Sequence, residues 1–490
     1  MTQSLRILLV SSEVEPFAKT GGLADVAGAL PRALRALGHD VRVLMPKYRG
    51  VDRHTALSTV VPRVRVPIGE RSTEGALLEG RMPGDIPIYF LAHDHYYDRP
   101  ALYGTGEADY LDNCERFVFF GRGTLEAIRA LEWTPQVVHA NDWQAGLVPV
   151  YVETLYKDDP ALATTGTLFT IHNLAYQGTF WHFDMPMTGL GWDLFTPAGL
   201  EFYGKLNFLK GGLVFADVLN TVSKTYAEEI QTAEFGAGLE GVLQYRSADL
   251  HGVVNGIDYQ AWNPATDRDI AKTYTADDLV GKGACKTALA EEMGLEAEGA
   301  PVIGIVSRLV AQKGLDLVLE ALPALVEAGF QVVLLGAGEP KLEKAFTEAA
   351  ASLRGRVAIR LGFDAALARR IYAGSDMFLM PSRYEPCGLG QMIAMRYGTI
   401  PIVRWTGGLA DTVAEVKPAR RTGTGFGFKE TTARALTEAA TRALATYRDA
   451  TLWRQVVRNA MAEDFSWQAS AKEYVALYRK AAKAAGRGHP

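Results

Sequence analysis

Short apolar segments alternate with amphipathic helical stretches along most of this chain, and this alternation limits the possible folds more than any other feature. In the first half, an apolar run at 5–11 precedes an amphipathic stretch at 23–38, and a second apolar run follows at 39–46. Later apolar runs read QVVHAN, GTLFTIHN, PVIGIV, QVVLLG, RVAIRL, MFLM and TIPIVR. Repeated β-α-β segments of this kind predict mostly parallel sheets with helices on both faces.

The chain is too long for a single hydrophobic core. At 490 residues it is expected to form two or more domains. The first α/β pattern ends near Tyr245, and the stretch after Val302 has the pattern of an independent α/β domain. We therefore predict a first domain over residues 1–246 and a second domain over residues 247–462.

Composition argues against several functional classes. The formal net charge of −5 disfavours nonspecific binding to nucleic acid or to anionic membranes, so neither is expected as a partner. No apolar run is long enough to span a bilayer, and the first residues lack the basic region and cleavage site of a signal peptide. Three scattered cysteines are too few for a disulfide framework or a zinc site. We therefore expect a cytoplasmic protein.

The hexapeptide TGGLAD occurs at 20–25 and again at 406–411. Each copy follows a predicted strand, at the carboxyl end where parallel sheets bind ligands. A glycine pair lets a ligand approach the backbone, and the helix that follows offers free N–H groups. We hypothesise that each half of the chain presents such a junction to one shared ligand. The alternative is two unrelated loop-to-helix junctions.

Further polar residues follow predicted strands in the first half. Lys19 immediately precedes the first TGGLAD, and a cation beside backbone N–H groups suits a phosphate. Asp142 follows the strand that contains His139, and His172 and Asn173 follow the next strand. Carboxylate, imidazole and amide groups at such positions can bind sugar hydroxyls. Hydrogen-bonded core histidines and a helix cap at Asp142 are the alternatives.

The second half carries a comparable set of charges. Arg308 and Lys313 follow the strand PVIGIV and could bracket one diphosphate. Glu385 enters a turn before a helix predicted to begin near Gly388, where a carboxylate could hold ribose or sugar hydroxyls. Exposed charges and a simple helix cap are the alternatives. The dinucleotide fingerprint is absent after the first predicted strand, and so is the P-loop motif, which disfavours NAD enzymes and P-loop NTPases.

Seven motifs, in their order along the chain, resemble those of the bacterial glycogen synthase family. They read EVEPFAKTGGLADV, HANDWQAGL, IHNLAYQG, VVNGID, SRLVAQKGLD, PSRYEPCGLGQ and TGGLADTV. The similarity runs from about Leu5 to Trp467. This family of ADP-glucose-dependent α-1,4-glucan glucosyltransferases also contains the plant starch synthases.

The resemblance implies an α/β protein with the GT-B fold, in which two Rossmann-like domains with parallel sheets flank an active-site cleft. It also implies that a C-terminal helix, here within residues 463–490, returns to the first domain. The implied reaction transfers glucose from ADP-glucose to the non-reducing 4-OH of an α-1,4-glucan, such as glycogen or a malto-oligosaccharide, with retention. It implies no cofactor and no obligatory metal, since ADP-glucose is a substrate.

The same resemblance assigns roles to individual residues. Those implied to act on the transferred glucose and the leaving group are Glu385, Arg308, Lys313, His172 and Asp142. Those implied to bind the donor are Lys19, Gly21, Gly22, Asn255, Phe363, Cys387, Gly388, Leu389 and Gly390. Those implied to face the acceptor are Tyr103, Asn173 and Asp25. Phe363 stands where the family places an aromatic ring against adenine.

Three positions depart from patterns common in the family and its relatives. The motif EPCGLT has Gly390 in place of its threonine, so one hydroxyl near the phosphate or adenine is lost. The motif HAHDW has Asn141 in place of its second histidine, which removes a group able to carry a proton. Other retaining GT-B families have a glutamate where this chain has Ile393, so other groups must hold the ribose.

The chemistry leaves some alternatives open. Glu385 and Asp142 are the available carboxylates for a covalent mechanism, and neither is clearly placed as a nucleophile. We therefore favour front-side attack, in which the leaving phosphate accepts the proton of the acceptor. A UDP-sugar transferase of the same fold, a glucan phosphorylase and a non-catalytic glucan-binding protein are the competing functions.

Overall fold

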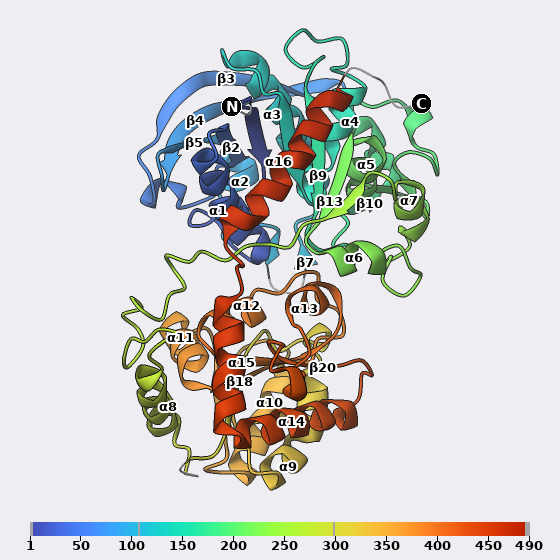
Figure 1. Cartoon of the computed structure of the whole chain (residues 1–490). Helices are drawn as coiled ribbons and strands as arrows, with labels where there is room; N and C mark the ends of the chain where they lie inside the picture. The colour runs from blue at the N-terminus through green and yellow to red at the C-terminus, as the bar shows by residue number, and fades with distance from the viewer. Residues whose placement is uncertain (1–2, 106–107, 297–298, 486–490) are drawn as a thin grey trace. The chain divides into compact units, whose positions relative to one another are not determined.

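The computed structural model describes residues 3–105, 108–296 and 299–485, which form two compact units (Figure 1). The first unit comprises the chain up to Val222, then Ala227–Val253 and the chain from Trp467 onward. The second unit comprises Ser223–Tyr226 and Val254–Ser466. Each unit is built around its own sheet, as the alternating pattern predicts. Within the described ranges, no helix is long and apolar enough to cross a bilayer.

The first unit contains a nine-stranded sheet in the order β14-β13-β9-β8-β1-β2-β5-β4-β3. The strands from β14 to β5 are parallel, and β4 and β3 extend the edge as an antiparallel hairpin. The strands are β1 (Arg6–Val10), β2 (Asp40–Pro46), β3 (Ser58–Ile68), β4 (Arg71–Met82), β5 (Ile86–Ala92), β8 (Val137–Asn141), β9 (Gly166–Ile171), β13 (Val218–Thr221) and β14 (Leu250–Gly252).

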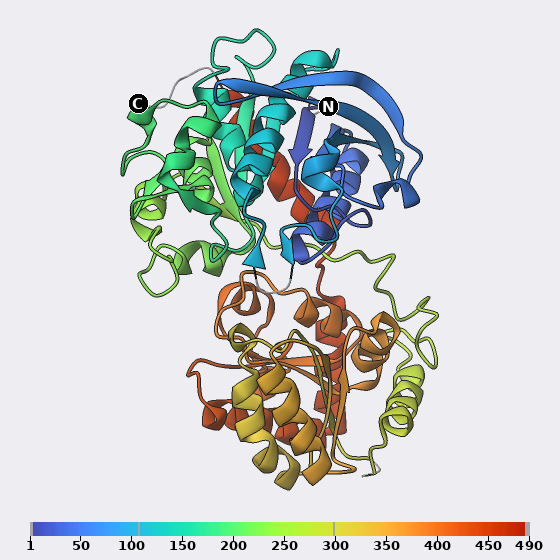
Figure 2. The same ribbon diagram turned by 180° about the vertical axis from the view of Figure 1, so that it is seen from behind.

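The antiparallel hairpin is an addition to the predicted parallel pattern. Figure 2 shows β3 and β4 as long curved blue strands at the edge of the sheet. Much of β3 is exposed, and its few buried positions alternate with exposed ones near its end. An edge strand of this kind carries no continuous apolar run. The pattern that predicts the buried parallel strands therefore does not predict β3.

Helices cover both faces of this sheet. They are α1 (Gly22–Ala36), α2 (Asp94–Tyr97), α3 (Asn113–Ala130), α4 (Leu147–Glu153), α5 (Phe208–Phe215), α7 (Glu240–Tyr245) and α16 (Trp467–Ala484). Small two- and three-stranded sheets lie in the connections: β6 (Gly104–Thr105) with β7 (Ala108–Asp109), and β12 (Lys205–Asn207) with β10 (Thr179–Trp181) and β11 (Glu201–Phe202).

The last helix of the chain, α16, is a structural part of the first unit. Figure 1 shows it, in red, lying across the sheet of that unit. Its Tyr474 and Tyr478 are fully buried. The Tyr474 hydroxyl accepts a hydrogen bond from Asn220 on β13, and the Tyr478 hydroxyl bonds to His139 on β8. The carboxy-terminal helix therefore completes the core of a unit that begins at the other end of the chain.

The second unit contains a six-stranded parallel sheet in the order β17-β16-β15-β18-β19-β20. The strands are β15 (Val302–Val306), β16 (Gln331–Gly336), β17 (Val357–Leu361), β18 (Met377–Met380), β19 (Ile400–Arg404) and β20 (Phe426–Phe428). The helices are α8 (Val280–Met293), α9 (Leu315–Glu327), α10 (Pro340–Ser352), α11 (Ala365–Gly374), α12 (Gly390–Arg396), α13 (Gly407–Thr412), α14 (Ala433–Arg448) and α15 (Ala450–Ala462). A short helix, α6 (Lys224–Glu229), spans the change between units.

Strand order decides which loops meet in each unit. In the first unit β8 lies between β1 and β9, so the loops that follow these three strands share one edge of the sheet. In the second unit β15 pairs with β18, which brings the loop after Val306 next to the loop after Met380. These two edges hold most of the polar residues that the sequence singles out.

Candidate functional site

The loop after β1 is held in place by a buried carboxylate. Glu13 is 4% exposed. One of its oxygens accepts hydrogen bonds from the backbone N–H groups of Thr20 and Gly21, and the other accepts from the hydroxyls of Thr20 and Tyr103. Sequence analysis did not single out Glu13, although an acidic residue between a buried strand and a glycine pair is a usable signal. Its role is to fix the glycine loop, with Tyr103 as a second support.

The first TGGLAD leaves its glycines open. Gly21 and Gly22 are exposed, and a Cβ added to either would meet no protein atom within 4 Å. Beside them, Lys19 Nζ lies 2.6 Å from Asp25 Oδ1 and 3.5 Å from a Glu15 carboxylate oxygen. Packing therefore does not require glycine at these two positions. Approach of a ligand to the backbone, as predicted from the sequence, remains a reason for them.

The second TGGLAD is used differently, which corrects the hypothesis of two equivalent junctions. Gly407 has a φ of 45°, and a Cβ there would lie 2.0 Å from the carbonyl oxygen of Glu385. A Cβ on Gly408 would lie 2.1 Å from the carbonyl oxygen of Cys387. The Gly408 N–H donates to the carbonyls of Glu385 and Pro386, both at 3.2 Å. These glycines let α13 pack directly on the backbone of the Glu385 loop.

His139, one of the polar residues at the end of β8, is a core histidine. It is fully buried, with Nδ1 2.9 Å from the Tyr478 hydroxyl and Nε2 2.7 Å from the Thr170 hydroxyl. Burial lowers its pKa to about 3. Both ring nitrogens are therefore occupied within the protein, and the structural alternative holds for this residue.

The Asp142 carboxylate is buried at the end of β8. The residue has a φ of 56°, and its Oδ1 accepts a hydrogen bond from the His172 N–H at 2.7 Å. Burial raises the pKa of Asp142 to about 7; the Glu13 charge adds to this rise, while backbone N–H groups of His172 and Asn173 oppose it. Such a carboxylate can accept a sugar hydroxyl in a water-poor environment.

The tautomer of His172 follows from its contact with Asn141. The Asn141 Nδ2 donates to the carbonyls of Val10 and His139, each at 3.1 Å, which fixes the direction of the amide. Its Oδ1 then faces His172 Nε2 at 2.9 Å and can only accept. Burial lowers the His172 pKa to about 3. His172 is therefore neutral, with the proton on Nε2 and an acceptor at Nδ1.

The acid stability of the first unit should depend on His139. Because the ring is neutral in the folded chain and titrates near 6.5 when unfolded, the unfolded state binds more protons below that pH, and stability falls as pH falls. His139→Gln should lower the slope of unfolding free energy against pH, between pH 4 and 6, by about 1.4 kcal/mol per pH unit. Denaturant melts at several pH values measure it, with the exposed His95→Gln as the matched control. Parallel slopes for His139→Gln and wild type would contradict it.

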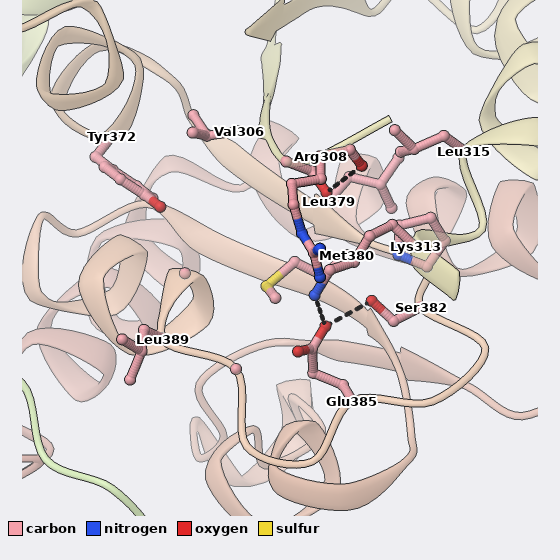
Figure 3. A pocket seen from close by; sticks show the side chains of 14 residues that line it. Val306, Arg308, Lys313, Leu315, Tyr372, Leu379, Met380, Ser382, Glu385 and Leu389 are labelled. Atoms are coloured by element: carbon pink, nitrogen blue, oxygen red, sulfur yellow. Dashed lines mark hydrogen bonds and ion pairs between the residues drawn. The ribbon is translucent and has the colours of Figure 1, made fainter. Parts of the chain in front are cut away.

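The second unit holds a cavity of about 210 Å³ between the ends of β15 and β18. It contains Arg308 and Lys313 from the loop after β15, Glu385 from the loop after β18, and Gly388–Gly390 at the start of α12. Figure 3 shows the Lys313 and Ser382 side chains directed to the Glu385 carboxylate. Residues far apart in the sequence thus form one polar pocket.

Glu385 lies at the centre of this polar group. It is 6% exposed, and its Oε2 accepts from Lys313 Nζ at 2.6 Å and from the Ser382 hydroxyl at 2.9 Å. An ammonium group has three protons, so Lys313 keeps two for an anion. Arg308 is exposed and lines the same pocket. Two cations beside a buried carboxylate suit a phosphate and a sugar hydroxyl together.

Glu385 is followed by a turn and then a helix, as predicted, but the helix begins later than expected. Gly388 has a φ of 72°, and α12 begins at Gly390 rather than near Gly388. Cys387 is buried, and burial raises its pKa to about 12. Its thiol lies beside the backbone N–H of Asn255, which therefore also adjoins this turn. The Asn255 side-chain oxygen is buried without a hydrogen-bond partner in the described chain.

Phe363, Asn173 and Tyr103 are among the predicted residues that do not line this cavity. Phe363 lies beyond the end of β17 and is 95% exposed, so its ring is free for stacking. Asn173 accepts a hydrogen bond from the Ala175 N–H, and Tyr103 uses its hydroxyl on Glu13 and Ser12. Their predicted contacts with adenine and with the acceptor stay predictions.

Comparisons with known proteins agree with one another. Residues 6–245 match the family model described as the starch synthase catalytic domain, and residues 290–460 match glycosyl transferases group 1. A glycogen synthase of Syntrophotalea carbinolica is 50% identical over 97% of this chain and 99% of its own. A glycogen synthase of Thermotoga maritima is 48% identical over 99% of this chain and its full length.

Solved structures show the same relationship. The catalytic domain of starch synthase IV from Arabidopsis thaliana, bound to ADP and acarbose, has a TM-score of 0.90 and 35% sequence identity. The similarity covers 98% of this chain and all of that one. A sucrose-phosphate synthase of Thermosynechococcus elongatus, at 19% identity and a TM-score of 0.57, shares the fold.

Proposed function

This chain belongs to the family of glycogen synthases and starch synthases, and we propose that it extends α-1,4-glucans with glucose taken from ADP-glucose. It is a glycosyltransferase with the GT-B fold, whose substrates are a nucleotide sugar and a glucan. The observation that carries the finer proposal is the pocket in which Lys313 and Ser382 converge on Glu385 beside Arg308.

The leaving group determines what the pocket must supply. Breaking the bond between the anomeric carbon and the phosphate oxygen places additional negative charge on the diphosphate. Arg308 and Lys313 stabilise that charge, and fixed cations in a sheltered site do so without reorganising when the bond breaks. Ser382 and Lys313 hold the Glu385 carboxylate in one position, where it accepts hydroxyls of the glucose.

The contacts of Glu385 favour front-side attack. Its Oε2 is engaged by an ammonium and a hydroxyl, which makes that oxygen a weak nucleophile. Asp142 already accepts a backbone N–H and lies at a strained position, so it serves better as an acceptor for a sugar hydroxyl. The acceptor 4-OH then attacks from the side of the leaving phosphate, which takes its proton. Retention follows without a covalent glucosyl-enzyme.

Residues of the first unit are assigned to the same substrates. Lys19 and the open backbone at Gly21 and Gly22 suit the diphosphate and the sugar. The neutral His172 presents an acceptor at Nδ1, which can receive a glucose hydroxyl. We also infer a cytoplasmic location, which the three unpaired, buried cysteines support.

The choice of nucleotide should depend on Phe363. A purine offers a wider face than a pyrimidine, so an exposed ring favours adenine by contact area. Phe363→Ala should raise the KM for ADP-glucose roughly 5- to 150-fold, on the scale of one base–aromatic stack, with a smaller loss in kcat. The preference for ADP-glucose over UDP-glucose should fall with it. Steady-state kinetics with both donors test this, and unchanged values would place the adenine elsewhere.

The activity itself is tested by incubation with a malto-oligosaccharide and either ADP-glucose or UDP-glucose. We expect nucleotide release that depends on the acceptor and is faster with ADP-glucose. Faster release from UDP-glucose would overturn the donor assignment. Release that does not lengthen the glucan would overturn the proposed transfer.

A further inference from the structure

Tyr372 on α11 places a hydroxyl in the pocket that neither the motifs nor the family resemblance assigned. Its side chain is 5% exposed, yet the residue lines the cavity beside Gly390 and Met380. Figure 3 shows the hydroxyl directed into the pocket, and in that view Lys313 and Glu385 lie away from it. Among the described residues, no protein group forms a hydrogen bond with this hydroxyl. The hydroxyl is therefore available to a ligand that enters the pocket.

Packing prevents the Tyr372 ring from turning to another partner. The ring lies 4.9 Å from that of Phe378, centroid to centroid, at an interplanar angle of 36°. The ring of Trp262 meets it edge-on at 5.8 Å and 82°. The Tyr397 ring lies 6.4 Å away, centroid to centroid. Three aromatic neighbours therefore hold the hydroxyl in one direction.

Gly390 faces the same corner of the pocket. A Cβ at this position would lie 3.4 Å from the Tyr372 hydroxyl, 3.4 Å from Met380 Sδ and 3.0 Å from Phe378 Cε1. A threonine, common in the family at this point, would crowd the hydroxyl. Gly390, which has no side-chain hydroxyl of its own, therefore adjoins the hydroxyl of Tyr372.

We propose that the Tyr372 hydroxyl binds the nucleotide part of the sugar donor, donating a hydrogen bond to a phosphate or ribose oxygen, and that Gly390 leaves the room for this contact. The inference rests on the proposed donor site. Burial raises the Tyr372 pKa further above its ordinary value, so the hydroxyl stays protonated and able to donate. The hydroxyl stands 3.4 Å from where a Cβ at position 390 would lie, so it reaches the part of the pocket that a side chain at that position would face.

Binding of ADP tests the proposal without relying on turnover. Tyr372→Phe removes one oxygen and keeps the ring, so ADP should bind roughly 2- to 12-fold more weakly by calorimetry, the scale of one net hydrogen bond. Tyr245→Phe, at an exposed tyrosine outside the cavity, is the matched control and should bind as wild type does. Thermal melts of each variant verify that the fold is kept.

A double-mutant cycle makes the test specific. Gly390→Ser alone should weaken ADP binding, because its side chain meets Tyr372 and Phe378. In the Tyr372→Phe background the same serine has more room and restores a hydroxyl, so affinity should recover toward wild type. Additive losses in the double mutant would overturn the proposal.

The failure of this inference can be told apart from failure of the proposed function. If Arg308→Ala weakens ADP binding and Tyr372→Phe does not, the donor site stands and the role of Tyr372 is wrong. If neither variant changes ADP binding, the nucleotide does not bind in this pocket and both are wrong.

Discussion

Arg308→Ala should lower turnover by roughly two to three decades, the usual result of removing one group that stabilises developing charge. The side chain is exposed and lines the pocket, so its loss removes charge from the leaving group and little from the core. The melting temperature should therefore stay near that of wild type. Initial rates at saturating ADP-glucose and glucan measure the effect.

Lys313→Ala should show a similar loss of turnover together with a loss of stability. Its ammonium pairs with the buried Glu385 at 2.6 Å, and among the residues that the structure describes the carboxylate would keep only Ser382 as a side-chain partner. Removing one partner of such a contact costs about 1–3 kcal/mol. A cation in a loop ordinarily contributes little to the stability of the fold. Lys313 is expected to contribute more because it forms this ion pair. Near-native turnover in both variants would exclude the two cations from the active site.

Lys344→Ala is the matched control for these cations. Lys344 lies on α10, is 78% exposed and has a distant ion pair with Glu348 at 3.9 Å. It changes the net charge as Lys313→Ala does, without touching the pocket. Unchanged turnover in this variant would show that the other losses are local. An equal loss would instead point to a general charge effect.

Asp142→Asn should separate activity from stability. The amide keeps an acceptor for the His172 N–H and loses the charge available to a sugar hydroxyl. A hydrogen bond to a charged group is worth enough that kcat/KM should fall roughly 10- to 150-fold. Steady-state kinetics with ADP-glucose measure this fall, and a wild-type kcat/KM would contradict the assignment.

The stability of the same variant should change in the opposite direction at neutral pH and above. With the pKa of Asp142 raised to about 7, the folded chain binds a proton that the unfolded chain releases near 3.8, so this carboxyl makes stability fall as pH rises between those values. Asparagine removes that fall. Relative to wild type, the free energy of unfolding of Asp142→Asn should therefore be higher at pH 8 than at pH 4, by on the order of a few kcal/mol. Denaturant melts at the two pH values measure the gain. Equal slopes would mean that the carboxyl is solvated.

Much of the fold could be predicted because parallel sheets carry a strong local signal. The buried runs of β1, β15 and β18 lack polar interruptions, and the residues that follow them stand at the edge where parallel sheets bind ligands. The edge strand β3 carries no such run, so the sequence pattern did not predict that the sheet is extended by an antiparallel hairpin. The limits of α12 differed by two residues because a left-handed glycine delays the helix.

The candidate site could be predicted for residues in the loops that follow strands. It could be predicted less well for residues whose role depends on contacts with distant parts of the chain. Arg308, Lys313 and Glu385 stand in loops that follow predicted strands, which a sequence reveals. Glu13 and Tyr372 act through hydrogen bonds and packing with residues far along the chain, which no local pattern encodes. The two identical hexapeptides show the same limit: open glycines in one copy and backbone packing in the other require the structure to distinguish them.

The most direct test of the donor site is a crystal structure of this chain with ADP. We expect a diphosphate contacted by Arg308 and Lys313, with Glu385 beside its outer phosphate and adenine against Phe363. ADP bound outside this pocket, or bound there with the diphosphate away from both cations, would contradict it.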